Sequence, residues 1–167
     1  MKKLLCMFVV MVMAMSTTLN VWAQTEFYGD TEVEEATIVN MKVLDDEVSV
    51  TGVTRGQYLS SVELNLTNEG FGVAGISAIV LCHEPMQRIK VRLTLEKKSG
   101  SSWININEKE FLWTEDTVDG ELSMALVSYK VGALLNGDYR LRASVSVRAL
   151  TLQSEAMAAR TETLTFK

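Results

Sequence analysis

The fold class is decided by the stretch RIKVRLTLE, residues 88–96. Every second residue from Ile89 to Leu95 is apolar, and the residues between them are polar or charged. Strict alternation over this length is typical of a β-strand with one face in a core and the other in water. We therefore predict a strand here whose outer face carries Lys90 and Arg92.

The same two-residue period recurs along most of the chain. We expect further strands within residues 62–66, 73–81, 103–113, 122–131, 139–148 and 161–166. Turn signals separate several of them: Ser-Gly-Ser at 99–101, Asp-Gly at 119–120 and Asn-Gly at 136–137, which suits two positive φ angles. One helical turn is assigned to residues 153–160. About seven strands with little helix predict an all-β fold, an antiparallel two-sheet sandwich of immunoglobulin-like type.

The first 23 residues have the layout of a secretory signal peptide. Two lysines open the chain, residues 4–15 are apolar, and small side chains precede a cut between Ala23 and Gln24. A retained membrane anchor is the alternative, but this apolar run is shorter than the roughly 20 residues that span a bilayer as a helix. We expect a secreted, extracellular bacterial protein that contacts the membrane only transiently, through residues 1–23.

The acidic charge is concentrated in residues 24–54. Eight acids lie between Glu26 and Glu47, where Lys42 is the single base, whereas residues 48–167 hold 13 acids and 13 bases. Such an asymmetry usually marks a flexible tail or an interaction segment. We predict an acidic, flexible N-terminal arm over residues 24–54, with at most one short strand at 38–44, followed by a β-sandwich domain over residues 55–167.

Catalytic signatures are weak in this sequence. His83 is the single histidine, and on a strand its neighbour Cys82 would point to the opposite face, so the two are poorly placed to act together. We interpret Cys82 as an inert buried thiol, with an intermolecular disulfide as the alternative. Glu108 and Glu110 could form the carboxylate pair of a glycan hydrolase, but cross-strand pairing with nearby cations is the favoured explanation. We predict no enzyme activity, no cofactor and no metal.

Two sets of residues are candidates for ligand binding. Trp103 and Trp113 could offer exposed rings to a sugar, although core packing is the default for aromatic residues in alternating strands. If strands 88–97 and 138–150 are neighbours, one outer face gathers Lys90, Arg92, Arg140, Arg142 and Arg148. We expect an extracellular glycan or an anionic cell-wall polymer as the partner, and no nucleic acid. A solvated face with local ion pairs is the alternative.

Other roles fit the same composition. The protein could be a structural exoprotein that associates with itself through an open edge strand or through the acidic arm, or an inhibitor of a secreted enzyme. The acidic arm could also screen the basic face in the same chain or in a neighbouring one. In that case, deleting residues 24–47 should strengthen polyanion binding at low salt.

Several short motifs occur in a recognisable order. Arg-Gly-Gln-Tyr-Leu opens the domain at residues 55–59, Gly-Ser-Ser-Trp follows at 100–103, and Gly-Asp-Tyr-Arg-Leu follows at 137–141. In order and spacing these resemble an uncharacterised family of small secreted β-sandwich proteins from Gram-positive anaerobic bacteria, over residues 55–167. The chain departs from that pattern at Arg140, where the family has a second tyrosine, and a few residues later, where it has a histidine. The resemblance implies the fold and export, and it implies no activity and no residue roles.

Overall fold

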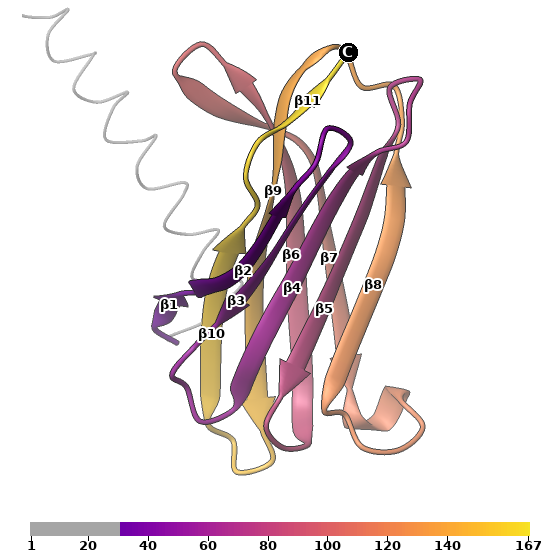
Figure 1. Cartoon of the computed structure of the whole chain (residues 1–167). Helices are drawn as coiled ribbons and strands as arrows, with labels where there is room; N and C mark the ends of the chain where they lie inside the picture. The colour runs from indigo at the N-terminus through magenta and orange to yellow at the C-terminus, as the bar shows by residue number, and fades with distance from the viewer. Residues whose placement is uncertain (1–30) are drawn as a thin grey trace, which may run out of the picture. The chain divides into compact units, whose positions relative to one another are not determined.

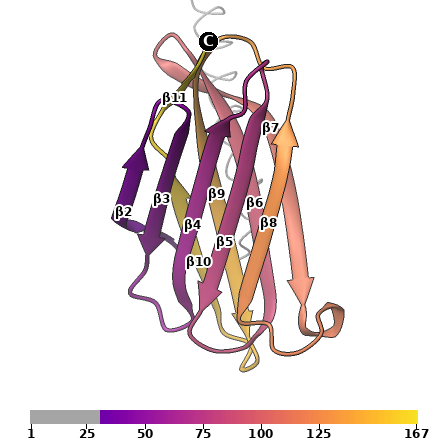
Figure 2. The same ribbon diagram turned by 45° about the vertical axis from the view of Figure 1, so that its right-hand side comes forward.

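Two β-sheets make up the part of the chain that the structure describes. The computed structural model describes residues 31–167, and Val33–Lys167 forms one compact unit. Figures 1 and 2 show the two sheets stacked as layers. We call the six-stranded layer sheet A and the five-stranded layer sheet B. The described residues are therefore all-β, in a β-sandwich-like arrangement, as the alternation in the sequence predicts.

Sheet B is antiparallel throughout. Its strands, in spatial order, are β2 (Thr37–Val43), β3 (Glu47–Val53), β4 (Leu59–Asn68), β5 (Ala74–Cys82) and β8 (Met124–Val131). Strand β2 lies at one edge and β8 at the other.

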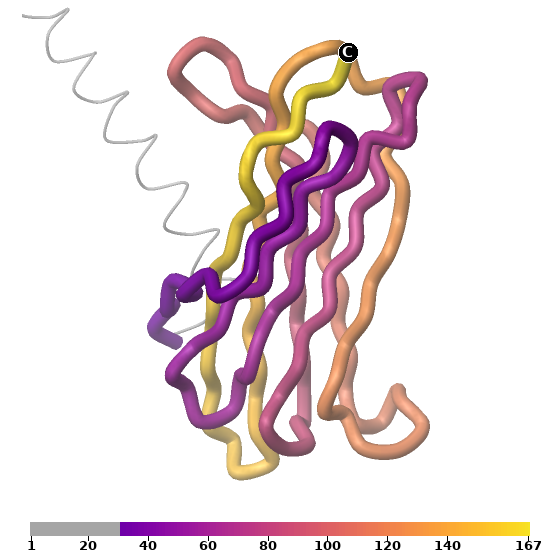
Figure 3. Tube along the Cα trace, viewed as in Figure 1, coloured from indigo at the N-terminus to yellow at the C-terminus, as the bar shows by residue number. Residues whose placement is uncertain are grey.

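Sheet A carries the longest strands. Its order is β1 (Val33–Glu35), β10 (Ser154–Arg160), β9 (Gly137–Ala149), β6 (Met86–Ser99) and β7 (Ser102–Thr114), with β11 (Leu164–Phe166) also pairing with β9. The pairing of β1 with β10 is parallel, and the others in this sheet are antiparallel. A 3-10 turn, η1 (Glu115–Thr117), follows β7. Only Ala36 separates β1 in sheet A from β2 in sheet B, a crossing that can be followed in Figure 3.

The core lies between the sheets and follows the alternation. On β6 the apolar residues of the RIKVRLTLE stretch are buried, with Ile89, Leu93 and Leu95 fully inaccessible to solvent. Leu64 and Leu66 on β4 supply the same kind of side chain from sheet B. Burying such side chains is the main driving force for stacking two half-apolar sheets, at about 1.5–3 kcal/mol for each.

The strands expected from the sequence are present as β4, β5, β6, β7, β8, β9 and β11. The Ser-Gly-Ser turn is also confirmed, because β6 and β7 form a hairpin in which Ser99 pairs with Ser102. Gly100, the central residue of Ser-Gly-Ser, has a φ of +62°, which glycine adopts without steric penalty.

Two local expectations for the C-terminal half were wrong. Residues 154–160 form strand β10 and not a helical turn, because pairing with β9 along their whole length overrides the weak strand preference of Ala, Glu and Met. The Asn-Gly signal at 136–137 does not close a hairpin: the chain there crosses from β8 in sheet B to β9 in sheet A. Of these two residues, Gly137 alone has a positive φ, at +147°.

The N-terminal boundary at residue 54 also differs from the expectation. Residues 33–53 form three strands, and β3 lies inside sheet B between β2 and β4. Val48 and Val50 of β3 are buried at 0% and 2% exposure, while Asp45 and Asp46 lie exposed in the turn before the strand. These acids therefore lie in the turn that precedes β3 and do not prevent the burial of that strand. The expected signal peptide over residues 1–23, and residues 24–30 of the expected arm, lie outside the described residues.

Candidate functional site

The outer face of sheet A carries the basic residues that the sequence singled out. Strands β6 and β9 are direct neighbours, with Thr94 opposite Arg142 and Glu96 opposite Arg140. This register places all five expected cations on one face, as predicted: Lys90, Arg92, Arg140, Arg142 and Arg148. Two more arginines lie on this face. Arg88 on β6 is the register partner of Arg148, and Arg160 on β10 is the register partner of Arg142.

Carboxylates on the same face compensate part of this charge. Glu96 accepts a hydrogen bond from Arg140 at 2.6 Å and lies 3.9 Å from Arg142. Glu110 lies 3.0 Å from both Lys90 and Arg92. Local ion pairing is therefore a property of this face, and it includes a part-buried pair in which Glu96 is 8% exposed.

The carboxylates considered for glycan hydrolysis belong to that ion-pair network. Glu108 lies 3.9 Å from Arg92 and accepts a hydrogen bond from Thr94. Partial burial raises the pKa of Glu110, but hydrogen bonds and charge attraction from Lys90 and Arg92 outweigh it, so the pKa lies below the ordinary value. A general acid needs the opposite shift.

A β-bulge separates the two candidate tryptophans. Leu95 pairs with Asn107 and Glu96 with Asn105, so Ile106 is an extra residue in β7. A bulge reverses the facing of the residues beyond it. Trp103 therefore lies on the outer face of sheet A, opposite Lys98, whereas Trp113 lies opposite the buried Ile89.

The expectation that Trp113 offers an exposed ring for a ligand is not met by its position. Its ring packs against the hydrophobic core and lies 6.1 Å from the Phe111 ring, centroid to centroid. Phe111 in turn lies 5.8 Å from Tyr129 on β8, so these aromatic side chains close the core between β7 and β8. The inward facing of this part of β7 is the cause, and Trp113 is a partly buried residue that packs against the core.

Trp103, by contrast, lies at a cavity of about 400 Å³, which we call the Trp103 pocket. Four stretches of chain build it, and its lining residues are Ile38, Met41, Trp103, Arg140, Arg160, Thr161, Glu162 and Thr163. The Arg140 guanidinium lies over the Trp103 ring, 4.2 Å from its centroid, and Glu96 holds its Nε. Both the position of the arginine and the orientation of the ring are thereby fixed.

The charges of the Trp103 pocket leave one cation available. Arg160 is exposed, and its side chain forms no ion pair with any other residue of the described part of the chain. Glu162 is the single acid of the lining, against two arginines. Ile38 and Met41, exposed at 38% and 47%, add an apolar wall from β2. The arrangement offers an aromatic ring, guanidinium donors and an apolar surface to one ligand.

Three lining residues of this pocket could not be placed from the sequence. Ile38 and Met41 lie in the stretch interpreted as a flexible arm, and Arg160 lies in the stretch assigned to a helical turn. Their signal was weak, since an isolated arginine after an alanine-rich run has no particular pattern. Trp103 and Arg140, in contrast, were expected as ligand residues, and the structure brings them together.

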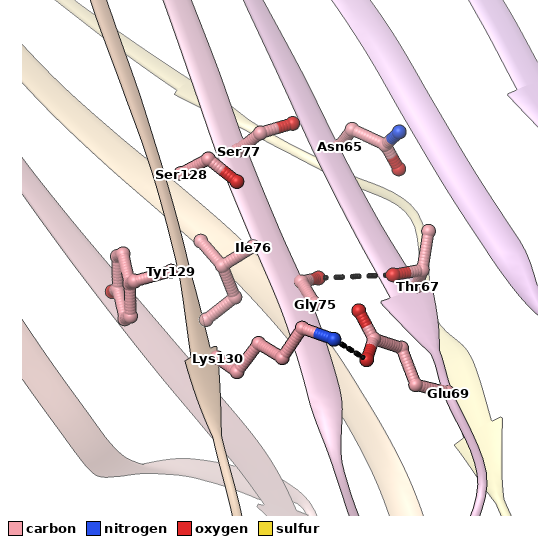
Figure 4. Close-up of a pocket in the computed structure, with 9 residues that line it drawn as sticks. All are labelled: Asn65, Thr67, Glu69, Gly75, Ile76, Ser77, Ser128, Tyr129 and Lys130. Carbon is pink, nitrogen blue, oxygen red and sulfur yellow. Dashed lines mark hydrogen bonds and ion pairs between the residues drawn. The ribbon is translucent and has the colours of Figure 1, made fainter.

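A second concavity, of about 270 Å³, lies on the outer face of sheet B over β4, β5 and β8 (Figure 4). Small polar side chains line it, including Asn65, Ser77 and Ser128. Lys130 forms an ion pair with Glu69 at one end, so the two charges cancel. This pocket offers hydroxyl and amide groups but no exposed aromatic face, because the Tyr129 ring contacts Phe111.

Cys82 and His83 do not form a reactive pair. Burial, with a smaller contribution from the charge of Glu155, raises the pKa of the Cys82 thiol to about 12. The thiol is free of any disulfide and is protonated at neutral pH. Within residues 31–167, no group of three or more His, Cys, Asp and Glu side chains is placed to hold a metal ion.

None of the helical segments within residues 31–167 is long and apolar enough to cross a membrane.

Comparisons with known proteins add no assignment. No family model matches this chain, and no curated protein matches it.

Proposed function

We propose that this protein is a secreted, non-enzymatic binding module with an immunoglobulin-like sandwich, and that it binds an acidic glycan in the Trp103 pocket. The observation that carries the proposal is the convergence of Trp103, Arg140 and Arg160 on one cavity. Export rests on the signal-peptide layout of residues 1–23. The resemblance of residues 55–167 to small secreted bacterial proteins supports the same compartment.

The order of the strands supports the immunoglobulin-like description. A hairpin of β4 and β5 in sheet B leads to β6 and β7 in sheet A, and β8 then returns to pair with β5. The chain crosses again to β9, which pairs with β6 and forms a hairpin with β10, and β11 then pairs with the start of β9. Greek-key crossings of this kind between two sheets are typical of immunoglobulin-like sandwiches. The Cys…Trp…Cys core of antibody domains has no counterpart here.

The composition of the pocket favours an acidic sugar. An aromatic ring packs against the apolar face of a pyranose, and a guanidinium binds a carboxylate through two parallel hydrogen bonds. Arg160 has no ion-pair partner among residues 31–167 and is available for this role, while Arg140 is held over the ring. A cavity of about 400 Å³ is within the range for small-ligand sites.

The same charges argue against nucleic acid and against catalysis. Nucleic-acid binding requires many phosphate contacts, and this acidic chain compensates much of its basic face internally. Glu110 keeps a lowered pKa beside Lys90 and Arg92, which suits an ion-pair partner better than a proton donor.

The test is calorimetric titration with trigalacturonate, with its fully methyl-esterified form as the uncharged control ligand. We expect binding of the acid form, and an affinity at least about tenfold weaker in Arg160→Gln, which removes one charge-assisted contact. Trp103→Ala should abolish binding. Lys130→Gln removes one positive charge from the opposite sheet and should bind like the wild type. Equal affinity of Arg160→Gln and wild type would remove the proposal.

Self-association is a second candidate, favoured by the state of β2. All seven residues of this edge strand are exposed, including Val39, Met41 and Val43. An open apolar edge is a template for pairing with another strand, although the bulge at Val39 and the charge of Lys42 oppose it. Light scattering over a concentration series tests this. A mass that stays at the monomer value up to millimolar protein would exclude it.

A further inference from the structure

Two arginines lie directly opposite each other at the far end of the basic face. Arg88 on β6 pairs with Arg148 on β9, and the next strands place Thr114 and Ser154 on either side of them. Like charges directly across an antiparallel pair repel each other. The arrangement therefore needs a compensating partner.

Neither guanidinium has such a partner among residues 31–167. The Nε atoms of Arg88 and Arg148 are both buried and form no hydrogen bond. Neither side chain takes part in an ion pair in this part of the chain, unlike Lys90 and Arg92 on the same face. A buried donor without an acceptor is unfavourable, and two that lie side by side point to a missing acceptor.

A cavity of about 190 Å³ adjoins the pair. Its lining consists of Gln87, Arg88, Thr114, Glu115, Asp116 and Arg148. The turn η1 closes it on the β7 side, where Thr114 and Thr117 hold each other by hydrogen bonds. The volume suits a small ligand group, because one carboxylate or one water cluster fits where a whole sugar chain would not.

We infer that Arg88 and Arg148 form a binding site for the carboxylate of a small, singly charged acid. Two guanidinium groups that line one cavity match the two oxygens of one carboxylate, which would give them the acceptor that they lack among residues 31–167. The bound anion would also neutralise the repulsion between the two arginines. Gln87 and Thr114 can hydrogen-bond the rest of the ligand.

The acids at the rim select the charge of the ligand. Glu115 and Asp116 are exposed and form no ion pair with either arginine. Their negative charges repel dianions such as phosphate and sulfate more strongly than a monoanion. They can also accept hydrogen bonds from hydroxyl groups, so a hydroxylated acid such as a uronic acid is the preferred chemistry.

This site goes beyond the proposed function because it lies elsewhere on the face. Arg140 of the Trp103 pocket and Arg148 are eight residues apart on β9, which corresponds to roughly 26 Å along an extended strand. Loss of one site therefore leaves the other in place, and the two proposals can fail separately.

The experiment is a nuclear magnetic resonance titration of the ¹⁵N-labelled protein with monomeric glucuronate, following the arginine Nε–Hε signals. We expect the signals of Arg88 and Arg148 to shift in a saturable manner, in the wild type and in Trp103→Ala alike. Acetate should shift them similarly at higher concentration, and phosphate at equal ionic strength should shift them less. Glu115→Gln combined with Asp116→Asn should strengthen the response to phosphate.

Matched variants complete the test. Arg148→Lys keeps the charge but removes the second donor, and it should weaken glucuronate binding at least about tenfold, as read from the remaining Arg88 signal. Arg160→Gln should leave the affinity at this site unchanged. Unshifted Arg88 and Arg148 signals at 50-fold excess of glucuronate over protein would overturn the inference. So would a shift of the Arg88 signal that persists with the same affinity in Arg148→Lys.

Discussion

Glu155 fastens the start of β4 to β10, and its removal is expected to destabilise the whole sandwich. Its Oε1 atom accepts a hydrogen bond from the backbone amide of Gln57 at 2.5 Å. Its Oε2 atom accepts two more, from Tyr58 at 2.9 Å and Leu59 at 2.8 Å. Gly56 leaves room for the carboxylate, since a Cβ there would lie 2.4 Å from Oε2.

The magnitude follows from which amides lose their acceptor. Tyr58 and Leu59 are buried at 4% and 0% exposure, so water cannot easily replace the carboxylate at their amides. Each unsatisfied buried donor costs about 1–3 kcal/mol, while the amide of the exposed Gln57 can turn to water. With two such amides, we expect Glu155→Ala to lower the free energy of unfolding by about 2–6 kcal/mol. Glu155→Gln keeps one acceptor oxygen and should lose about half of that.

The assay is urea denaturation of both variants, followed by circular dichroism. The midpoint should fall while the slope stays constant, because the unfolded surface is unchanged. Glu84→Gln, which changes an exposed acid in the turn before β6, is the control and should shift stability by less than about 0.5 kcal/mol. A change of less than 0.5 kcal/mol in Glu155→Ala would refute the anchoring role.

Three further predictions concern single side chains. Because the pKa of Cys82 is raised to about 12, its thiol should react with a disulfide reagent at pH 8 at least about 100-fold more slowly in the native than in the unfolded protein. The free energy of unfolding should also decline as the pH rises from 9 towards 12, because the unfolded chain loses this proton first. Equal labelling rates in the two states would contradict this prediction. The lowered pKa of Glu110 means that its ion pairs stabilise the fold above the unfolded-state pKa and are lost as pH falls through the folded-state pKa. Glu110→Gln should therefore cost less than about 1 kcal/mol at pH 7, and this cost should shrink as the pH is lowered, as read from thermal melts. Deleting Ile106 removes the bulge and turns Trp103 inward, so trigalacturonate binding should be lost while the circular dichroism spectrum stays β-rich; retained binding would show that the bulge does not orient the ring.

Alternation predicted the strands whose two faces differ in polarity. RIKVRLTLE has the same pattern in the sequence and in the structure, because β6 lies inside sheet A with one face on the core. The basic face was predictable for the same reason, since the even-numbered residues of β6 from Arg88 onward share one side with the even-numbered residues of β9.

Elements that depend on tertiary context escaped sequence reasoning. Strand β10 is rich in Ala and exists because β9 offers an open edge beside it. Strand β3 does alternate, but the acids before it suggested a solvated arm, and they lie in a turn instead. The side of the sheet on which Trp103 lies depends on a single extra residue in β7. In so short a stretch, the alternation of apolar and polar residues does not reveal a bulge.

The proposed role of the Trp103 pocket is tested most directly by the fluorescence of that tryptophan itself. In a Trp22→Phe, Trp113→Phe variant, Trp103 is the single tryptophan of the chain, and it carries the Arg140 guanidinium on its ring. Titration with trigalacturonate should change its emission saturably, with the affinity found by calorimetry, and the change should vanish in an added Arg160→Gln exchange. Unchanged Trp103 emission while calorimetry still detects binding would contradict the account.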